Sequence, residues 1–211
     1  MTDKIIRLSI RDRHLMYAGA VAMAGPKETR IALCGVHIAP SFNNNNGVFI
    51  VATDGKLLSI GYDPEATTEN LPGVGITLAV PKNAISPLKA RTDKPVLWQS
   101  DTRLLSTDGK HFECPEIEQT YPAWDRLISS SVAADAKAEG PTYSAHTMRK
   151  LALIAEALTP AQWDSPSPIQ IDAGEGMEPR WVSVGYENWR GVIMPLKSML
   201  PSLRSRPSWL S

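Results

Sequence analysis

Two copies of one turn constrain this 211-residue chain more than any other feature. Asp54-Gly55 lies between an apolar, β-branched run, Val48–Val51, and a second run, Leu57–Tyr62. Asp followed by Gly supplies the positive φ angles that a two-residue hairpin turn requires, so the stretch predicts two strands joined by a tight turn. Asp108-Gly109 stands in a second stretch of this kind, 54 residues further along. This spacing indicates a duplicated supersecondary unit.

The elements expected around the two turns support the duplication. Before the first turn, the pattern predicts a strand at Ile5–Ile10, a helix at Arg11–Ala24 that ends at Gly25-Pro26, and a strand at Arg30–Ala39. The second stretch has a helix that Pro87 bends or shortens, and its elements are Gly75–Val80, Pro81–Ala90, Lys94–Gln99, Arg103–Ser106 and Lys110–Cys114. Both follow the order strand, helix, strand, strand, strand. We call each a half-unit, at 4–63 and 74–130, and together they predict one domain over 1–130.

A third half-unit is expected at 141–197, after a small, polar linker at 131–140. It would hold a brief strand at Thr142–Ser144 and a helix from the N-cap Ser144 through Leu158. Three strands follow, at Ile169–Asp172, Arg180–Tyr186 and Gly191–Leu196. An unpaired half-unit leaves an open sheet edge, so we expect self-association into a homo-oligomer.

Composition excludes several classes of function. Lys plus Arg equals Asp plus Glu at 22 each, so no global charge indicates a nucleic-acid partner. Cys34 and Cys114 are expected to be free thiols in a reducing cytosol. The chain shows no apolar run of about 18 residues and no signal-peptide core, so a cytoplasmic protein is expected.

Candidate catalytic and metal-binding groups are poorly arranged. His14, His37, His111 and His146 lack the spacing of metal ligands, and no Ser-His-Asp, phosphate-loop or dinucleotide pattern is present. The sequence therefore predicts no cofactor, no metal and no enzyme activity. An enzyme on an unrelated α+β fold is the weakest of the alternatives.

Five ordered motifs resemble the bacterial DNA sliding clamp, the β subunit of DNA polymerase III, from about Ile5 to Lys197. They are RIALCGV at 30–36, VATDGKL at 51–57, VPK at 80–82, YPAWDRLI at 121–128 and VIMPLK at 192–197. The resemblance implies an α+β DNA-clamp fold of repeated β-α-β-β-β half-units, with antiparallel sheets and helices on one face. That family has six half-units per chain and this chain has three. Lys56-Leu57 replaces the family's usual polar residue and Arg, and a tail at 198–211 follows the family's usual end. These departures suggest a reduced relative of the kind that a phage or mobile element carries.

The resemblance implies a non-enzymatic processivity or protein-docking factor in DNA replication, with a hydrophobic pocket for peptides of replication proteins. Carried across position by position, the pocket would be formed by Leu33, Thr53, Gly55, Lys56, Leu57, Leu58, Pro122, Arg126, Leu127, Val192, Met194 and Leu196. The alternative is that most of these residues belong to an ordinary core.

The resemblance also implies helices that face duplex DNA and attract its phosphates without reading sequence. The basic residues on or next to the expected helices are Arg11, Arg13, Lys82, Lys89, Arg91, Arg149 and Lys150. They could equally form a solvated surface. A second functional hypothesis is an adaptor or inhibitor of host replication proteins that does not encircle DNA, and the tail, with Trp209 and Leu210, could occupy a neighbour's pocket or be disordered.

Overall fold

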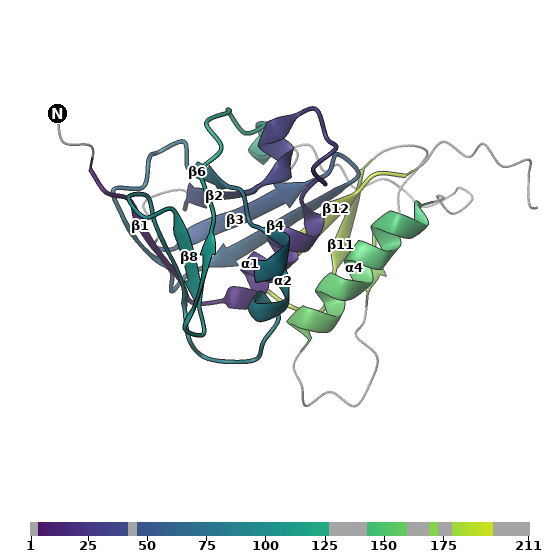
Figure 1. Ribbon diagram of the computed structural model, residues 1–211. Helices are drawn as coiled ribbons and strands as arrows, with labels where there is room; N and C mark the ends of the chain where they lie inside the picture. Colours follow the sequence, from purple (N-terminus) through teal and green to yellow (C-terminus); the bar gives the residue numbers. More distant parts are fainter. Residues whose placement is uncertain (1–3, 42–45, 127–142, 160–168, 173–178, 196–211) are drawn as a thin grey trace, which may run out of the picture.

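The computed structural model describes residues 4–41, 46–126, 143–159, 169–172 and 179–195. Within these ranges two antiparallel sheets are covered by three α-helices (Figure 1), which confirms the α+β class. The expected linker at 131–140 and the tail at 198–211 lie outside the described residues.

The larger sheet has seven strands in the order β10-β11-β12-β4-β3-β2-β6. Its strands are β2 (Val36–Pro40), β3 (Val48–Thr53), β4 (Leu57–Asp63), β6 (Ile76–Leu78), β10 (Gln170–Ile171), β11 (Arg180–Ser183) and β12 (Trp189–Ile193). All neighbours pair antiparallel. The strands of the third half-unit therefore continue the sheet of the first.

The smaller sheet has the order β5-β1-β7-β8-β9. It comprises β1 (Arg7–Ile10), β5 (Thr67–Glu69), β7 (Val96–Gln99), β8 (Leu104–Thr107) and β9 (Lys110–Glu113). The first two half-units exchange their first strands, because β1 pairs with β7 and β6 pairs with β2. This exchange joins the two half-units into one body.

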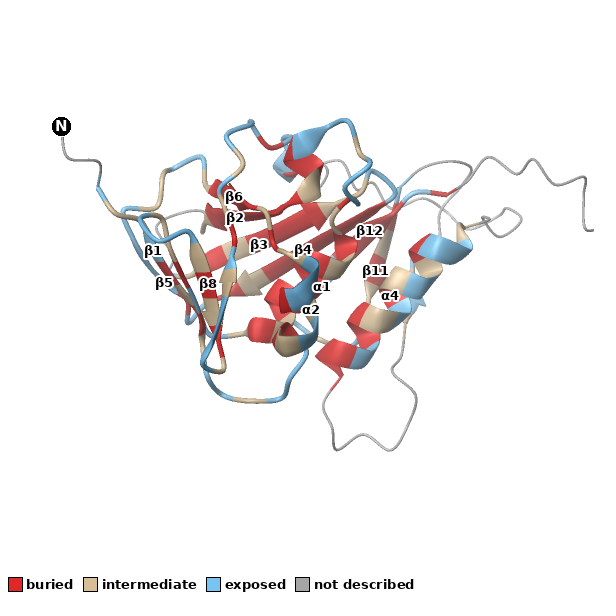
Figure 2. Ribbon diagram, in the orientation of Figure 1, coloured by how far each residue is buried: buried red, intermediate tan, exposed pale blue. Residues whose placement is uncertain are grey.

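The helices α1 (Arg13–Ala22), α2 (Lys82–Leu88) and α4 (Ala145–Leu158) lie side by side over one face of the larger sheet (Figure 1). Asp12 caps α1, since its carboxylate accepts hydrogen bonds from the backbone N–H groups of His14 and Leu15. Figure 2 shows α1 buried between its neighbours. The second half of the helix, Ala18–Ala22, carries small side chains apart from Val21, which allows neighbouring elements to pack closely against it.

Three local features differ from the sequence-based expectation. Residues Ile31–Cys34 form a 3₁₀ helix, η1, in place of the first half of the expected strand at Arg30–Ala39. Strand β5 was not expected, because Thr67–Glu69 is short, polar and exposed and forms only by pairing with β1. Tyr143 and Ser144, the described part of the expected strand at Thr142–Ser144, are not in a strand.

The two Asp-Gly turns also differ from each other. Asp108-Gly109 forms the expected two-residue turn, since Thr107 pairs with Lys110 and both turn residues have positive φ. At the first turn Thr53 pairs with Leu58, so the loop is four residues long and only Gly55 has positive φ. The longer loop places Asp54 where its side chain can serve other contacts.

Candidate functional site

The pairing of β4 with β12 brings residues about 130 positions apart into one surface. In this register Leu58 lies opposite Val192, and the Met194 N–H donates to the Lys56 carbonyl at 2.8 Å. Trp189 fixes the pairing, because its buried indole N–H donates to Ser59 Oγ at 2.8 Å. The third half-unit is thus joined to the first along a continuous hydrogen-bonded edge, which we call the seam.

Side chains alternate across the seam, as in any strand. Leu58 and Val192 lie on the face away from the helices, in a small apolar cluster with Tyr121 and Trp124. Leu57 faces the other way and is buried in the main core. This corrects the expectation for Leu57, which is a core residue and not part of the outer surface.

The turn between β3 and β4 forms one end of this surface. The Asp54 carboxylate accepts hydrogen bonds from the N–H groups of Lys56 and Leu57, each at 2.9 Å. Gly55 has φ +84°, and a Cβ there would lie 3.1 Å from the Arg30 guanidinium beside η1. Both the backbone conformation and the close approach therefore favour glycine at this position.

Lys150 on α4 forms an ion pair with the turn between β3 and β4. Its Nζ lies 2.8 Å from Asp54 Oδ2 and donates to the carbonyls of Ala22 and Met23 at 3.1 and 2.9 Å. Burial acts to raise the pKa of Asp54, but the bonds from Lys150 and from the two backbone N–H groups outweigh it and leave the pKa below its usual value. This ion pair joins the third half-unit to the turn.

An aromatic segment covers part of the surface. Tyr121 and Trp124 are buried against the small cluster, and the Trp124 ring lies 5.4 Å from that of Phe49, a tilted arrangement typical of aromatic pairs. Pro122 and Arg126 on the same segment are exposed. The segment packs on the outer face of the seam through Tyr121 and Trp124, and it does not add a strand there.

The structure brings together most of the described residues that were expected to line the pocket. Met194 is an exposed large apolar side chain at 38%, and its N–H bonds the carbonyl of the exposed Lys56, next to the exposed Gly55. Pro122 and Arg126 are exposed on the segment whose Tyr121 and Trp124 pack with Leu58 and Val192. Leu33 is buried at 2% exposure. Leu127 and Leu196 lie outside the described residues. We call Thr53, Gly55, Lys56, Leu58, Pro122, Arg126, Val192 and Met194 the seam surface.

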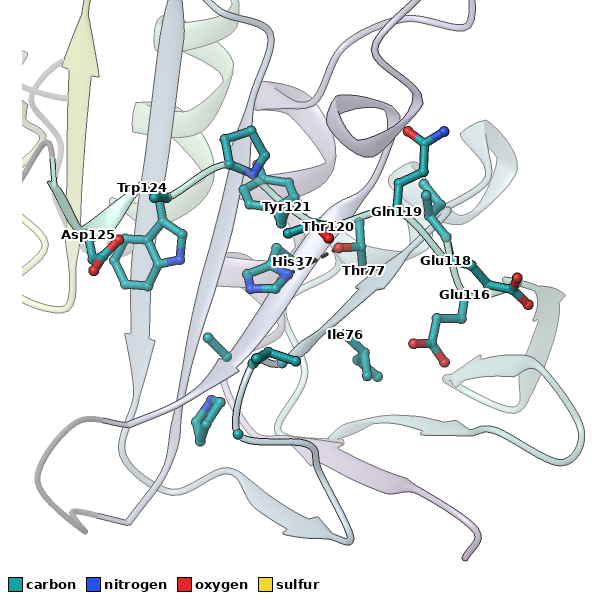
Figure 3. Close-up of a pocket in the computed structure, with 18 of the residues that line it drawn as sticks. His37, Ile76, Thr77, Glu116, Glu118, Gln119, Thr120, Tyr121, Trp124 and Asp125 are labelled. Atoms are coloured by element: carbon teal, nitrogen blue, oxygen red, sulfur yellow. Dashed lines mark hydrogen bonds between the residues drawn. The ribbon is translucent and has the colours of Figure 1, made fainter. Parts of the chain in front are cut away.

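An adjoining cleft of about 660 Å³, which shares Pro122 with the seam surface, was not expected from the sequence. Figure 3 shows Trp124 and Asp125 at one end, Glu116 and Glu118 at the other, and His37 and Tyr121 between them. The His37 ring stacks on Tyr121 at 4.5 Å, and His37 Nδ1 lies 3.1 Å from Thr77 Oγ1. Burial lowers the pKa of His37 to about 4, so the ring is neutral at pH 7.

The basic residues expected to face DNA divide into two groups. Arg13 is buried, and its guanidinium binds Asp108, Thr107 and the Pro87 carbonyl. Lys150 is committed to the turn described above. Both expectations are therefore corrected, because the cationic groups of these side chains are enclosed by protein partners.

The second group lies at the protein surface. Lys89 lies 3.4 Å from Glu156, Arg91 donates to the Thr159 carbonyl, and Arg11 lies 3.9 Å from Glu65. The exposed basic residues of this set are Arg11, Lys82, Lys89, Arg91 and Arg149. Of these, Lys82 and Lys89 lie on α2 or at its end and Arg149 lies on α4, whereas Arg11 and Arg91 lie outside both helices.

Among the described residues no three His, Cys, Asp or Glu side chains are placed to hold a metal ion. Within the same part of the chain, no helix has the length and apolar character needed to cross a bilayer. The described Cys34 and Cys114 are both free thiols, and burial raises the pKa of Cys114 to about 12.

Comparison of the whole architecture identifies its relatives in structure. No protein-family model and no curated protein matches the chain. A sliding clamp from Bartonella birtlesii bound to griselimycin aligns with a TM-score of 0.64 at 16% identity, over 94% of this chain and 67% of that chain. The Helicobacter pylori clamp bound to a DNA ligase peptide aligns at 0.63 and 12%, and a Caulobacter crescentus clamp at 0.60 and 14%, each over the same shares. None of these comparisons bears on a phage origin. This chain therefore has the fold of the bacterial DNA sliding clamps, over about two thirds of the length of those proteins.

Proposed function

We propose that this protein is a non-enzymatic, sliding-clamp-like factor of DNA replication that docks short peptides of replication proteins on the seam surface. The observation that carries the proposal is the β4–β12 pairing, which places Met194 beside Lys56 and Val192 beside Leu58. The surface forms only where the first and third half-units are joined, at the β4–β12 pairing. A docking role accounts for this junction.

The chemistry of the seam surface suits an apolar peptide with an acidic or polar flank. Met194 offers a flexible, polarizable side chain that adapts to different ligands. Lys56 and Arg126 supply exposed cationic groups at the rim. The Helicobacter pylori clamp of the same fold is bound to a DNA ligase peptide, which supports this class of partner.

Titration of a fluorescent clamp-binding peptide, followed by anisotropy, tests the docking role. Met194→Arg replaces an apolar contact worth about 1.5–3 kcal/mol, so the dissociation constant should rise by about 10–100-fold. Leu97→Arg is the matched control, because Leu97 is similarly exposed at 44% but lies on β7 in the other sheet. Equal affinities of the two variants, or no binding by the unaltered protein, would refute the proposal.

We further propose that α2 and α4 face duplex DNA. Lys82, Lys89, Arg91 and Arg149 are exposed there, with Glu156 as an opposing acid on α4. Contacts of this kind neutralise phosphates and release counterions, so affinity should fall steeply with salt. An adaptor that does not act on DNA would instead bind the peptide and show no salt-dependent binding of duplex.

Self-association is proposed from the sheet topology. In the first two half-units, β2 and β7 each have the first strand of the other half-unit at one edge. β10 holds the equivalent place in the third half-unit and ends the seven-stranded order among the described residues. A second copy could supply a strand there. Light scattering during size-exclusion chromatography should give a mass above 23.1 kDa, whereas a monomer at every accessible concentration would remove this part of the proposal.

A further inference from the structure

The cleft lined by Tyr121 and Trp124 has an unusual balance of charge. Among the described residues that line it, the three charged side chains, Glu116, Glu118 and Asp125, are exposed carboxylates, and none is Lys or Arg. His37 adds no positive charge, since it is buried and neutral at pH 7. The cleft is therefore acidic in a chain whose net charge is zero.

The surfaces between these carboxylates are apolar and aromatic. Figure 3 shows Tyr121 and His37 in the middle and Trp124 toward the end that holds Asp125. Val74 at the rim is 84% exposed, the most exposed of the large apolar side chains among the described residues. A concave surface that combines aromatic side chains with a few charged groups is typical of binding sites, and Val74 adds exposed apolar area to it.

Residues 198–211 have the complementary chemistry. They carry Arg204 and Arg206, follow Lys197, and contain no Asp or Glu. Pro201 and Pro207 favour an extended conformation, the form in which proline-containing segments bind aromatic grooves. Trp209 and the leucines of the segment supply apolar side chains of the kind that the cleft and Val74 would bury.

We propose that the segment 198–211 of this chain docks in its own acidic cleft, with its arginines at the carboxylates and its apolar residues against the aromatic floor. The segment begins three residues after Pro195, which follows Met194 at the seam. The Tyr121–Trp124 segment contributes both to the seam cluster and to the cleft, so the two surfaces are continuous. This proposal does not depend on the proposed replication function.

The length of the segment is sufficient. Sixteen residues follow Pro195, and an extended chain covers about 3.3 Å per residue, or roughly 50 Å in all. The radius of gyration of a compact chain of this size is about 17 Å. The segment can therefore reach any part of the cleft, and electrostatic complementarity selects the site.

Paramagnetic relaxation in the full chain tests the proposal. A spin label is placed at Ser208→Cys in a Cys34→Ser background, where the fully buried Cys114 does not react. At low salt we expect the amide signals of Gly73–Thr77 and Glu116–Asp125 to lose most of their intensity, and to recover at about 1 M salt, where the Debye length is about 3 Å.

Charge exchange supplies the matched controls. The pair Glu116→Lys/Glu118→Lys should abolish the broadening, and combining it with Arg204→Glu/Arg206→Glu should restore it. Asp101→Lys/Glu113→Lys makes the same change of charge at exposed positions outside the cleft and should leave the broadening intact.

Several outcomes would overturn the proposal. One is the absence of selective broadening at the cleft, and another is broadening centred on Lys56 and Met194, which would place the segment on the seam surface. A third is broadening in a mixture of spin-labelled and isotope-labelled chains, which would show that the segment binds a second copy. Folding of each variant is checked by the unperturbed signals of α1.

Discussion

Replacing Lys150 by Met tests whether the third half-unit is held to the first by a buried ion pair. The Met side chain keeps most of the apolar stem and removes the ammonium group. That group makes three bonds, to Asp54 Oδ2 and to the carbonyls of Ala22 and Met23. In the variant the Asp54 carboxylate would retain only the two backbone N–H groups that bind it in the turn.

The expected cost follows from how far the pair is enclosed. Removing one partner of a fully buried pair costs about 3–5 kcal/mol, whereas exposed pairs contribute about 0–1 kcal/mol. The side chains of Lys150 and Asp54 are 13% and 12% exposed, so we expect a loss of about 2–3 kcal/mol, near the buried limit. With an m value of about 2–3 kcal/mol/M in urea, the unfolding midpoint should fall by about 1 M.

Urea unfolding of the single variants and of Lys150→Met/Asp54→Asn provides the assay. Because the two side chains are in contact, the double-mutant cycle should give a coupling of about 1–2 kcal/mol. Lys89→Met is the matched control: its pair with Glu156 is 44% and 59% exposed and should contribute less than about 0.5 kcal/mol.

The pH dependence has a defined sign. The folded state lowers the pKa of Asp54, so the pair stabilises the protein above the unfolded pKa of about 3.9 and loses its effect as pH falls through the lower folded pKa. The deficit of Lys150→Met should therefore be full at neutral pH and shrink below about pH 4. A deficit no larger than that of Lys89→Met, or one that persists unchanged in acid, would refute the reasoning.

Three further predictions concern other parts of the molecule. Burial lowers the pKa of His37 to about 4, so the unaltered protein should lose about 2–3 kcal/mol of stability as pH falls from 6.5 to 4. His37→Phe should abolish this loss, which urea unfolding across that pH range measures. Gly55→Ala forces a side chain into φ +84° beside a guanidinium and should cost about 1–2 kcal/mol, lowering the melting temperature by about 2–8 °C in calorimetry. Lys82→Glu/Arg149→Glu should weaken duplex binding and flatten its salt dependence in filter binding, whereas Lys110→Glu, at the start of β9, should change neither.

The strands and helices were largely predictable because each carries a local signal. Alternating apolar residues identified β1, and Gly25-Pro26 identified the end of α1. The 3₁₀ helix η1 was missed, since Ile31–Cys34 is as apolar as a strand and its backbone bonds partners distant in sequence, Ala24 and Gln119. Strand β5 has no local sequence signal, because its residues are polar and it forms only through hydrogen bonding to β1.

The candidate site was only partly predictable for a different reason. Resemblance placed Lys56 and Met194 in one surface, but it could not show that Leu57 faces the core, which depends on the register of β4. From the sequence, Arg13 is expected at the surface, because its partner Asp108 lies 95 residues away and only the folded structure shows their contact. The acidic cleft was missed because its carboxylates and aromatic rings come from separate segments that no spacing rule connects.

The most direct test of the central claim is hydrogen exchange of the full chain with and without a saturating clamp-binding peptide. We predict slower exchange at the turn of Thr53–Leu58, in the Tyr121–Arg126 segment and at Met194, with no change on α2 or α4. Protection confined to the helices or to the smaller sheet, with the seam exchanging at its free rate, would contradict the claim that the joined half-units form the docking surface.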